Sequence, residues 1–280
     1  MSEDVQTQIE FINNLKKLGY TDVAKLNVNK HRKYRNYYKA KFNHGDWVFI
    51  KWAFRPVALD VEEFEAERKF YMVAGETIFP VPKNHCNCAI ATKYIGNAIN
   101  LVEIIKKGSL LEVDAYTRKT FQNYVEFLNV YDNISPIFGD FDCYSFFKMY
   151  LERWIQYSVK HKVTIEIVWQ ISKCLLFLRQ LILPLKSVVH CVVVGDFNAW
   201  NCLCYSGNVI FIDLSYVSRG DPNIEVASFY VRLMHHARKR QDLKTVIDRN
   251  LHIFTDSKYH SSRIFNFSVR VFKFIERYWQ

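Results

Sequence analysis

The stretch "VVVGDFNAWNCLCYSGNVIFIDLS", residues 192–215, places two carboxylates and a carboxamide around a short hairpin pattern. Asp196 and Asn201 stand five positions apart, and Asp213 ends the apolar run that follows the glycine turn. A strand pair joined at Gly207 would return Asp213 to the end of the hairpin at which the other two residues lie. Two carboxylates and a carboxamide gathered at one end of a hairpin are candidate site residues, and the rest of the chain has to indicate which chemistry they serve.

The composition of the whole chain is that of a globular protein. Its 280 residues are half hydrophobic, so a sizeable core can form, and its formal net charge of +10 favours an anionic partner without choosing among nucleotides, nucleic acids and acidic membranes. The polar N-terminus does not have the pattern of a signal peptide, so none is expected, and no apolar run is long enough to suggest a membrane span. The seven cysteines fit neither a disulfide framework nor a zinc site, so we expect structural roles in a reducing cytoplasm, including for the close pairs Cys86/Cys88 and Cys202/Cys204.

Periodicity divides the chain into a β-rich part and a helical part. Alternating aromatic residues predict a hairpin over 34–42 and 46–53, followed by a helix with Asp60 as N-cap and Gly75 as stop. Apolar spacing predicts further helices over residues 3–18, 114–130, 144–158, 164–183, 223–236, 241–251 and 260–279. We therefore expect an α+β fold, with a small N-lobe over 1–96 and a larger, mostly helical C-lobe over 97–280.

The opening stretch resembles the active-site motifs of the protein-kinase-like phosphotransferases. "GDFNAWN" resembles their catalytic loop, Asp-x-x-x-x-Asn, and "FIDLS" resembles the segment with their metal-binding Asp. "RGDPNIEVASF" is similar to the segment that follows in aminoglycoside phosphotransferases, choline kinases and lipopolysaccharide core-sugar kinases, with Glu225 in the last acidic position. The resemblance covers residues 35–230 by order of elements and is specific over 194–229. It implies the two-lobed protein-kinase-like fold.

The resemblance also implies roles for the three residues of the opening stretch. Asp196 would be the catalytic residue that orients the acceptor hydroxyl and accepts its proton. Asn201 and Asp213 would bind Mg²⁺. Phosphoryl transfer asks the protein mainly for positioning and charge neutralisation, and these three side chains supply both.

Further residues match the nucleotide site of the same family. Lys51 interrupts the apolar strand "WVFIKWA", where a charge needs a partner, and the resemblance makes it the ligand of the α- and β-phosphates of ATP. Its helix partner would be Glu67 in "FEAERKF", with Glu63, one turn earlier, as the alternative. "KYIGNAIN" resembles the hinge that contacts adenine, which makes Tyr94 and Ile95 the expected contacts within residues 91–95.

The phosphate-covering loop departs from the protein-kinase pattern, because no glycine stands between Gly19 and Gly45. Small-molecule kinases of this fold manage with few glycines and a Ser or Asn before the second strand, a place that Asn36 takes here. The basic residues of the preceding run would supply positive charge instead: Lys30, Arg32, Lys33 and Arg35. Val194 replaces the usual His, and Asn198 replaces the Lys of protein kinases, which argues against protein substrates.

These observations predict an ATP- and Mg²⁺-dependent kinase acting on a hydroxyl of a small molecule or glycan, such as a lipopolysaccharide or polysaccharide sugar. The alternative is a catalytically inactive, pseudokinase-type binding protein, which the missing glycines and the missing His would explain. Nucleic acid is not expected as a partner, since charge alone carries no recognition motif. We expect a cytoplasmic protein whose basic segment 235–244 allows peripheral association with the inner membrane surface. The sequence defines neither the acceptor nor the oligomeric state.

Overall fold

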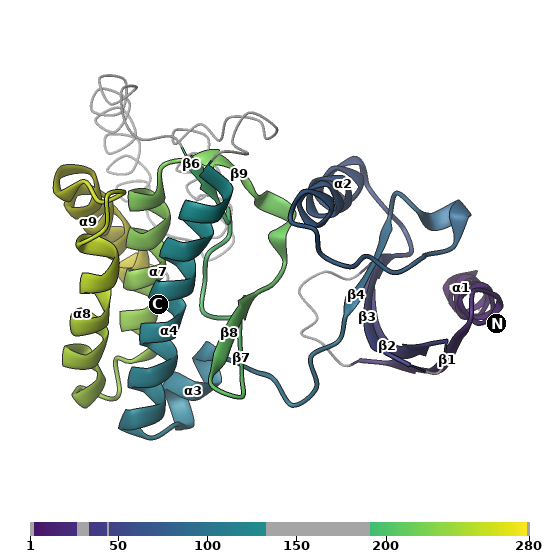
Figure 1. The fold of residues 1–280 in the computed structure, drawn as a ribbon, viewed down its shortest axis with the longest axis horizontal. Helices are drawn as coiled ribbons and strands as arrows, with labels where there is room; N and C mark the ends of the chain where they lie inside the picture. Colours follow the sequence, from purple (N-terminus) through teal and green to yellow (C-terminus); the bar gives the residue numbers. More distant parts are fainter. Residues whose placement is uncertain (1–2, 27–33, 44, 133–190, 279–280) are drawn as a thin grey trace. The chain divides into compact units, whose positions relative to one another are not determined.

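The computed structural model describes residues 3–26, 34–43, 45–132 and 191–278 (Figure 1). For Leu59, Ser215 and residues 274–278 it describes the backbone alone. The chain forms two compact units. The N-terminal unit comprises Met1–Ala98 together with Asp213–Tyr216, and the helical unit comprises Ile99–Ile212 and Val217–Gln280. The first unit holds a four-stranded sheet and the second is mostly helical, which confirms the predicted α+β class. The helices expected over 144–158 and 164–183 lie outside the described residues, as do Lys30, Arg32 and Lys33.

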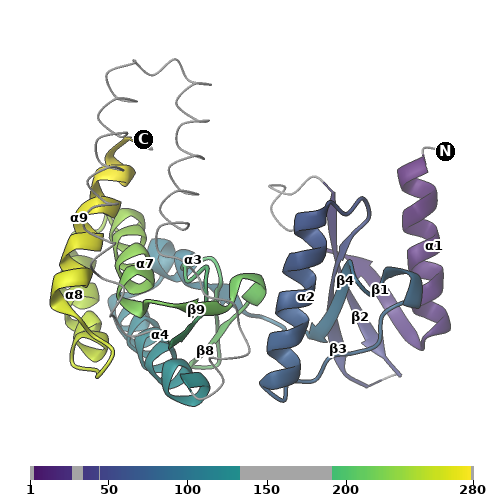
Figure 2. The same ribbon diagram turned by 90° about the horizontal axis from the view of Figure 1, so that it is seen from above.

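The sheet of the N-terminal unit is antiparallel, in the order β1 (Tyr20–Lys25), β2 (Arg35–Phe42), β3 (Trp47–Ala53) and β4 (Ala89–Lys93). The helices α1 (Glu3–Lys17) and α2 (Ala58–Val73) lie on opposite sides of it (Figure 2). The pair β2–β3 is the hairpin that the aromatic alternation predicted. Its register places Tyr37 opposite Lys51 and Asn36 opposite Trp52.

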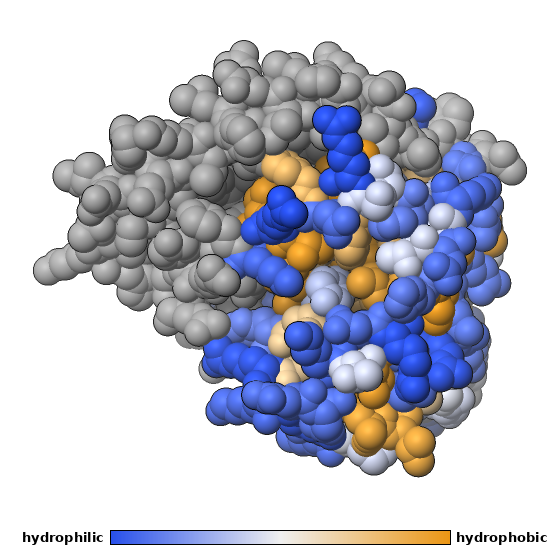
Figure 3. All heavy atoms as spheres, turned by 90° about the vertical axis from the view of Figure 1, so that its left-hand side faces the viewer, coloured by the Kyte–Doolittle hydropathy of each residue, from blue (hydrophilic) through white to orange (hydrophobic). Residues whose placement is uncertain are grey.

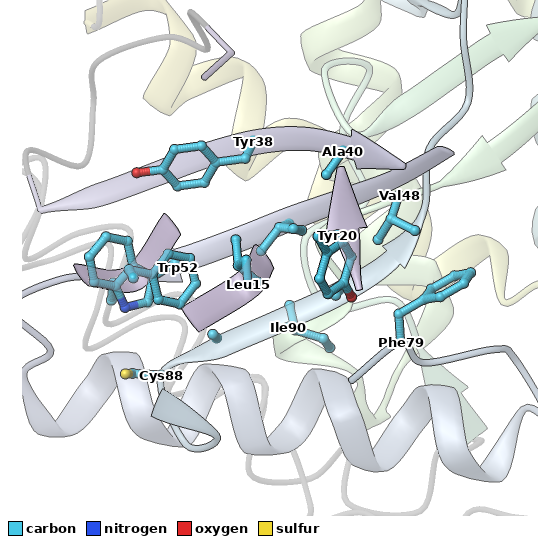
Figure 4. Packing of buried hydrophobic residues seen from close by; sticks show 14 of the residues in the cluster. Leu15, Tyr20, Tyr38, Ala40, Val48, Trp52, Phe79, Cys88 and Ile90 are labelled. Atoms are coloured by element: carbon cyan, nitrogen blue, oxygen red, sulfur yellow. The ribbon is translucent and has the colours of Figure 1, made fainter. Parts of the chain in front are cut away.

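Strand alternation separates an apolar face of this sheet from a charged one. Tyr38, Ile50 and Trp52 are buried in the core beneath α1, and Figure 4 labels Tyr38 and Trp52 among the core side chains. The Phe11 ring of α1 stacks on Trp52 at a centroid distance of 3.9 Å. Neighbouring residues of a strand point to opposite faces, so Lys51 is directed away from that core. The face that bears Lys51 is the one that α2 covers, because Glu67 of this helix contacts the Lys51 ammonium.

The start of α2 differs from the sequence prediction. Val57 rather than Asp60 is the N-cap, and Asp60 lies inside the first turn, where its carboxylate accepts the Val57 N–H at 3.1 Å. A carboxylate in the first turn still accepts a backbone N–H group that has no partner within the helix, and its charge complements the helix dipole. An acidic residue is therefore favourable in the first turn as well as at the N-cap. The helix ends as predicted: Ala74 is the C-cap, and Gly75 follows with φ of +70°.

The helical unit is built on α3 (Leu101–Lys107), α4 (Leu110–Tyr131), α7 (Pro222–His236), α8 (Asp242–Thr255) and α9 (Ser262–Tyr278). Two small sheets accompany them: β5 (Ile99–Asn100) with β7 (Cys202–Tyr205) and β8 (Asn208–Phe211), and β6 (Cys191–Val193) with β9 (Ser218–Gly220). The predicted hairpin is the pair β7–β8, which turns at Ser206 and Gly207, both with positive φ. Positive φ angles at both residues give the turn a twist that matches the twist of the strands that it joins.

The cysteines of the described ranges are free thiols. Cys202 and Cys204 are buried on one face of β7, as strand alternation predicts, whereas Cys86 and Cys88 lie in a turn after the short helix Lys83–His85. Within residues 3–26, 34–43, 45–132 and 191–278, no helix has the length and apolar character needed to cross a membrane. Among the coloured residues of Figure 3, hydrophilic ones predominate, with hydrophobic residues gathered between them.

Candidate active site

Lys51 is held between two carboxylates of the N-terminal unit. Its Nζ lies 2.9 Å from Oε2 of Glu67 on α2 and 2.5 Å from Oδ1 of Asp213, which is 162 positions away in the chain. The Lys51 and Glu67 side chains are each only 5% exposed, so this is a buried ion pair that explains the charge inside an apolar strand. In the structure Lys51 therefore contacts Glu67, the first of the two expected partners.

The charge state of this cluster follows from its surroundings. Burial by itself would lower the pKa of Lys51, but the two neighbouring carboxylates raise it above its ordinary value, so the ammonium form is kept. Burial raises the pKa of Glu67, and Lys51 opposes that shift. Asp213 differs from Glu67 because its side chain is 39% exposed, which leaves this carboxylate accessible to a further cation.

Asp213 owes its position to a strained turn. Its φ is +58°, a left-handed conformation that a non-glycine residue adopts at a cost. The chain leaves β8 at this residue and enters the short helix η4 (Leu214–Tyr216), which packs against α2. The turn therefore brings a residue that is distant in sequence beside Lys51.

Glu63 belongs to a second buried cluster on the same helix. The Arg35 guanidinium binds Oδ1 of Asp60 through Nε at 2.9 Å and Nη2 at 2.5 Å, and Nη2 also donates to Glu63. The Tyr216 hydroxyl donates to the other carboxylate oxygen of Glu63. The expectation that Arg35 supplies charge to a phosphate loop is therefore wrong, because two carboxylates hold its guanidinium inside the unit.

Asn36 and the hinge residues lie apart from Lys51 within the N-terminal unit. Asn36 pairs across the strands with Trp52, so its buried side chain is on the apolar face, and its amide nitrogen bonds to no described residue. The Tyr94 N–H donates to the carbonyl of Trp47 at 2.8 Å, and Ile95 follows it after the end of β4. The structure does not bring Asn36 to Lys51, and an adenine contact at Tyr94 and Ile95 stays a prediction.

The helical unit holds Asp196 and Asn201 together in one loop. The Asn201 amide nitrogen donates to the Asp196 carbonyl at 3.0 Å and to its Oδ2 at 3.2 Å. Oδ1 of the buried Asn198 accepts the N–H groups of Trp200 and Asn201 at 2.9 and 3.1 Å. Asn198 is therefore a brace of the loop. The loop is joined to β8 by the Ile212 N–H, which donates to the Asn201 carbonyl at 2.9 Å.

Glu225 holds the start of the loop from α7. Its carboxylate accepts the Tyr124 hydroxyl at 2.6 Å and the N–H groups of Gly195, Val194 and Phe197 at 2.5, 3.0 and 3.4 Å. Burial raises the pKa of Glu225 to about 7, although these four donors favour the charged form. Sequence reasoning noted the residue without a role. An acidic residue among the apolar positions of the helix that Asp221 caps could have indicated a buried carboxylate with hydrogen-bond partners.

Four side chains of α7 contact residues of the same loop. Glu225, Phe229, Arg232 and His236 are spaced by four, three and four positions, which places them on one face of the helix. The Phe229 ring stacks on Phe197 at 4.1 Å, Arg232 Nη1 lies 3.7 Å from Oδ1 of Asp196, and the His236 ring meets Trp200 edge-on at 6.1 Å. Arg232 and His236 were missed from the sequence, since the loop residue that each contacts lies more than thirty positions earlier.

The comparisons with known proteins give no match by sequence, either to a family model or to a curated protein. The fold does match solved structures. The aminoglycoside phosphotransferase APH(3'')-Id of Streptomyces rimosus, in complex with ADP and streptomycin, has a TM-score of 0.68 at 12% identity over 99% of both chains. The ethanolamine kinase of Plasmodium vivax has a TM-score of 0.58 at 10% identity over 95% of this chain and 75% of that one. The choline kinase LicA of Streptococcus pneumoniae has a TM-score of 0.54 at 14% identity over 97% and 90%.

These similarities confirm the predicted fold. The chain has the protein-kinase-like phosphotransferase fold, in the form found in choline kinases and aminoglycoside phosphotransferases. The identities are too low to carry an activity or a substrate over to this chain. Its function has to be argued from its own side chains.

Proposed function

We propose that the protein is an ATP- and Mg²⁺-dependent kinase that transfers the γ-phosphoryl group to a hydroxyl of a small molecule or glycan. The observation that carries this proposal is the buried cluster of Lys51, Glu67 and Asp213. A buried lysine with two carboxylates is costly to assemble, and one of those carboxylates is partly exposed. Such a cluster is understandable where the lysine binds phosphate and the exposed carboxylate binds a metal ion.

The residues suit Mg²⁺ by the chemistry of their donors. The Asp213 carboxylate is a hard oxygen ligand. The Asn201 side chain donates to Asp196 through its nitrogen, so its amide oxygen could bind a metal ion. The described ranges contain no group of three or more His, Cys, Asp or Glu side chains that could hold a metal alone. Mg²⁺ often takes one or two protein ligands and completes its shell with phosphates and water, so this donor set fits a metal carried by the nucleotide. Bound there, Mg²⁺ would neutralise charge on the transferred phosphate.

The protein's own residues would then divide the remaining work. Lys51, oriented by Glu67, would bind the α- and β-phosphates through its ammonium group. Asp196 would accept a hydrogen bond from the acceptor hydroxyl and take its proton as the phosphoryl group transfers. Asn201 would hold the Asp196 carboxylate in position through its amide N–H. Glu225 would keep the loop fixed by binding its backbone.

The similar structures support a small-molecule acceptor and a nucleotide donor. They include kinases of choline and ethanolamine and phosphotransferases solved with streptomycin or kanamycin, in some cases with ADP or GDP. A lipopolysaccharide or polysaccharide sugar as the acceptor rests on the motif resemblance and the basic composition.

The direct test follows phosphate release and transfer from γ-labelled ATP in the presence of Mg²⁺. We expect turnover in the wild type and a loss of about 10²- to 10⁴-fold in Asp196→Asn, which keeps the shape of the side chain but removes the base. Nucleotide affinity should stay within about threefold, because Asp196 is proposed to contact the acceptor. Equal turnover in both proteins would exclude Asp196 from the mechanism. Tight nucleotide binding with no turnover in the wild type would favour the binding-protein alternative.

We also propose a cytoplasmic location, where ATP is available, with peripheral contact to an anionic inner membrane surface through segment 235–244. Within that segment Arg238 and Lys239 are exposed beyond the end of α7, whereas Arg240 binds the carbonyls of Ile105 and Gly108 at 3.2 and 2.6 Å. Cosedimentation with phosphatidylglycerol vesicles should exceed that with neutral vesicles and should fall with salt. Equal cosedimentation with both would rule the membrane contact out.

A further inference from the structure

We propose that the turn between α3 and α4 and the turn between α7 and α8 form one docking surface for an anionic lipid membrane. This double-turn surface comprises residues 103–112 and 238–244. In it Leu110 and Leu111 enter the lipid, and the basic residues around them bind the headgroups. The inference rests on the membrane contact proposed above for segment 235–244 and adds an apolar contact from a distant part of the chain. It does not depend on the kinase function.

Arg240 joins the two turns. Its Nη1 donates to the carbonyl groups of Ile105 and Gly108 at 3.2 and 2.6 Å, and its Nη2 lies 3.2 Å from Oδ2 of Asp242. The two carbonyl groups belong to the end of α3, where backbone acceptors lack partners within the helix and a basic side chain is favourable. Segments that are more than 130 positions apart in the chain thus lie side by side, at the lower end of the helical unit in Figure 1.

Leu110 and Leu111 are the first two residues of α4, and they are 44% and 81% exposed. Among the described residues, no large hydrophobic residue is more exposed than Leu111. The Ser109 hydroxyl accepts the Glu112 N–H at 3.2 Å and the Glu112 carboxylate accepts the Ser109 N–H at 2.8 Å, so a capping box fixes the turn. A single exposed leucine needs no explanation, but an adjacent pair held on a fixed turn among basic residues is typical of a contact surface.

The double-turn surface is basic. It contains six Lys and Arg residues against three Asp and Glu residues. Five of the cations are exposed: Lys106, Lys107, Arg238, Lys239 and Lys244. The acidic residues bind groups of the surface itself: Glu103 contacts Lys107, Asp242 contacts Arg240, and Glu112 accepts the Ser109 N–H. The charge that this surface presents to a partner is therefore positive.

The combination of positive charge and apolar exposure selects the partner. An anionic membrane surface attracts nearby Lys and Arg side chains, and its acyl region accepts leucine side chains. A soluble polyanion such as a nucleic acid would match the charge but would leave both leucines in water. A second copy of this chain would cover the leucines but would place like charges against each other. A lipid surface with anionic headgroups satisfies both features.

The test measures cosedimentation of the full-length protein with vesicles of phosphatidylcholine, either alone or with about one-third phosphatidylglycerol. We expect the wild type to bind the anionic vesicles at least about tenfold more tightly than the neutral ones. Leu111→Ser should weaken binding to the anionic vesicles by about tenfold or more, because the inserted leucine is lost. Val130→Ser is the matched control, since Val130 is 54% exposed at the other end of α4, and binding should stay within about twofold.

A second pair of variants tests the charges. The double variant Arg238→Gln/Lys239→Gln should weaken binding to the anionic vesicles by at least about tenfold, because each cation close to such a surface contributes to binding. The double variant Arg263→Gln/Arg270→Gln removes the same charge from exposed positions on α9 and should have little effect. Equal losses in the two double variants would show that net charge, and not this surface, determines binding.

Further outcomes would also overturn the inference. Equal effects of Leu111→Ser and Val130→Ser would remove the leucine contact and leave the contact of segment 235–244 standing alone. Equal binding to the two kinds of vesicle would exclude the anionic headgroups. A lipid-independent dimer that Leu111→Ser dissociates, seen by sedimentation velocity, would make a second copy the partner. Unfolding temperatures show that each variant is folded, and Mg²⁺-ATP binding in the same samples shows separately whether the kinase function has failed.

Discussion

The two units fix their functional residues by different means. In the N-terminal unit, Lys51 and Arg35 are each buried against two carboxylates, so side-chain charges hold α2, β2, β3 and η4 together. In the helical unit, a single buried carboxylate, Glu225, holds the loop through uncharged donors, most of them backbone N–H groups. Under the proposed function, the first arrangement would fix the charges that meet the phosphates of the nucleotide. The second fixes the path of the backbone that carries Asp196.

This difference predicts how each unit fails. Removing one partner of a buried ion cluster leaves an uncompensated charge, which is costly at any pH at which that charge exists. Removing the charge of Glu225 leaves neutral donors with one acceptor oxygen still in place. The N-terminal unit should therefore be sensitive to substitution, and the loop of the helical unit should be sensitive to pH.

The largest effect is expected for Arg35→Met. The substitution keeps the bulk of the side chain but leaves Asp60 and Glu63 buried without their cation, which should cost about 3–5 kcal/mol of unfolding free energy. Lys41→Met on the same strand is the matched control, because its pair with Asp22 at 3.6 Å is exposed and should contribute less than about 1 kcal/mol. Urea unfolding measures both. Equal losses would show that the Arg35 cluster does not stabilise the unit.

The next effect is the pH dependence of Glu225. Its pKa is about 7 in the folded protein against an ordinary value of 4.5, so the folded state binds the proton more tightly than the unfolded chain does. The stability contributed by this group should therefore be highest below about pH 4.5, fall as pH rises and level off above about 7. The total change should be a few kcal/mol.

Glu225→Gln isolates this contribution, since it keeps one acceptor oxygen and does not titrate. The unfolding temperature of the wild type minus that of the variant should decrease from pH 5 to pH 8. Glu65→Gln, at an exposed position of α2, is the control for the same change from carboxylate to amide. A difference that rises with pH would mean that the hydrogen bonds to Glu225 outweigh its burial, and the sign of the pKa shift would then be reversed.

The smallest effect is expected for Tyr216→Phe. The lost hydroxyl leaves Glu63 bonded to Arg35, so unfolding free energy should fall by only about 1 kcal/mol. Because Tyr216 ends the short helix that begins after Asp213, the affinity for Mg²⁺-nucleotide should also fall, by a few-fold. Tyr20→Phe is the control, since its hydroxyl is also in the N-terminal unit but donates to the carbonyl of Pro80 at 2.8 Å. Equal nucleotide affinities in the two variants would remove Tyr216 as a positioning residue.

The elements that local sequence patterns determine were predicted from the sequence. The hairpin β2–β3, the pair β7–β8 and the helices α7 to α9 follow from alternation, turn residues and helical spacing. The placement of Lys51 was also predictable, because a lysine in an apolar strand requires a partner. Asp60 was misplaced within its helix because N-cap and first-turn positions both favour Asp.

The long-range clusters were not predictable in the same way. Arg35 ends a run of basic residues that looks solvated, and its burial depends on carboxylates 25 and 28 positions away. The partners of Glu225 lie 28 to 101 positions earlier in the chain. No local pattern encodes such pairings, since they form only when α2 and α7 pack against their neighbours.

The measurement that tests the central claim most directly is calorimetric titration with ATP, with and without Mg²⁺, of the wild type and Asp213→Ala. If the protein is a Mg²⁺-dependent kinase, ATP should bind the wild type at least about tenfold more tightly with Mg²⁺ than without it. Asp213→Ala should lose that Mg²⁺ increment and keep the weaker, metal-free binding. The same Mg²⁺ increment in the variant would contradict the metal role of Asp213, and no nucleotide binding by the wild type would contradict the kinase function.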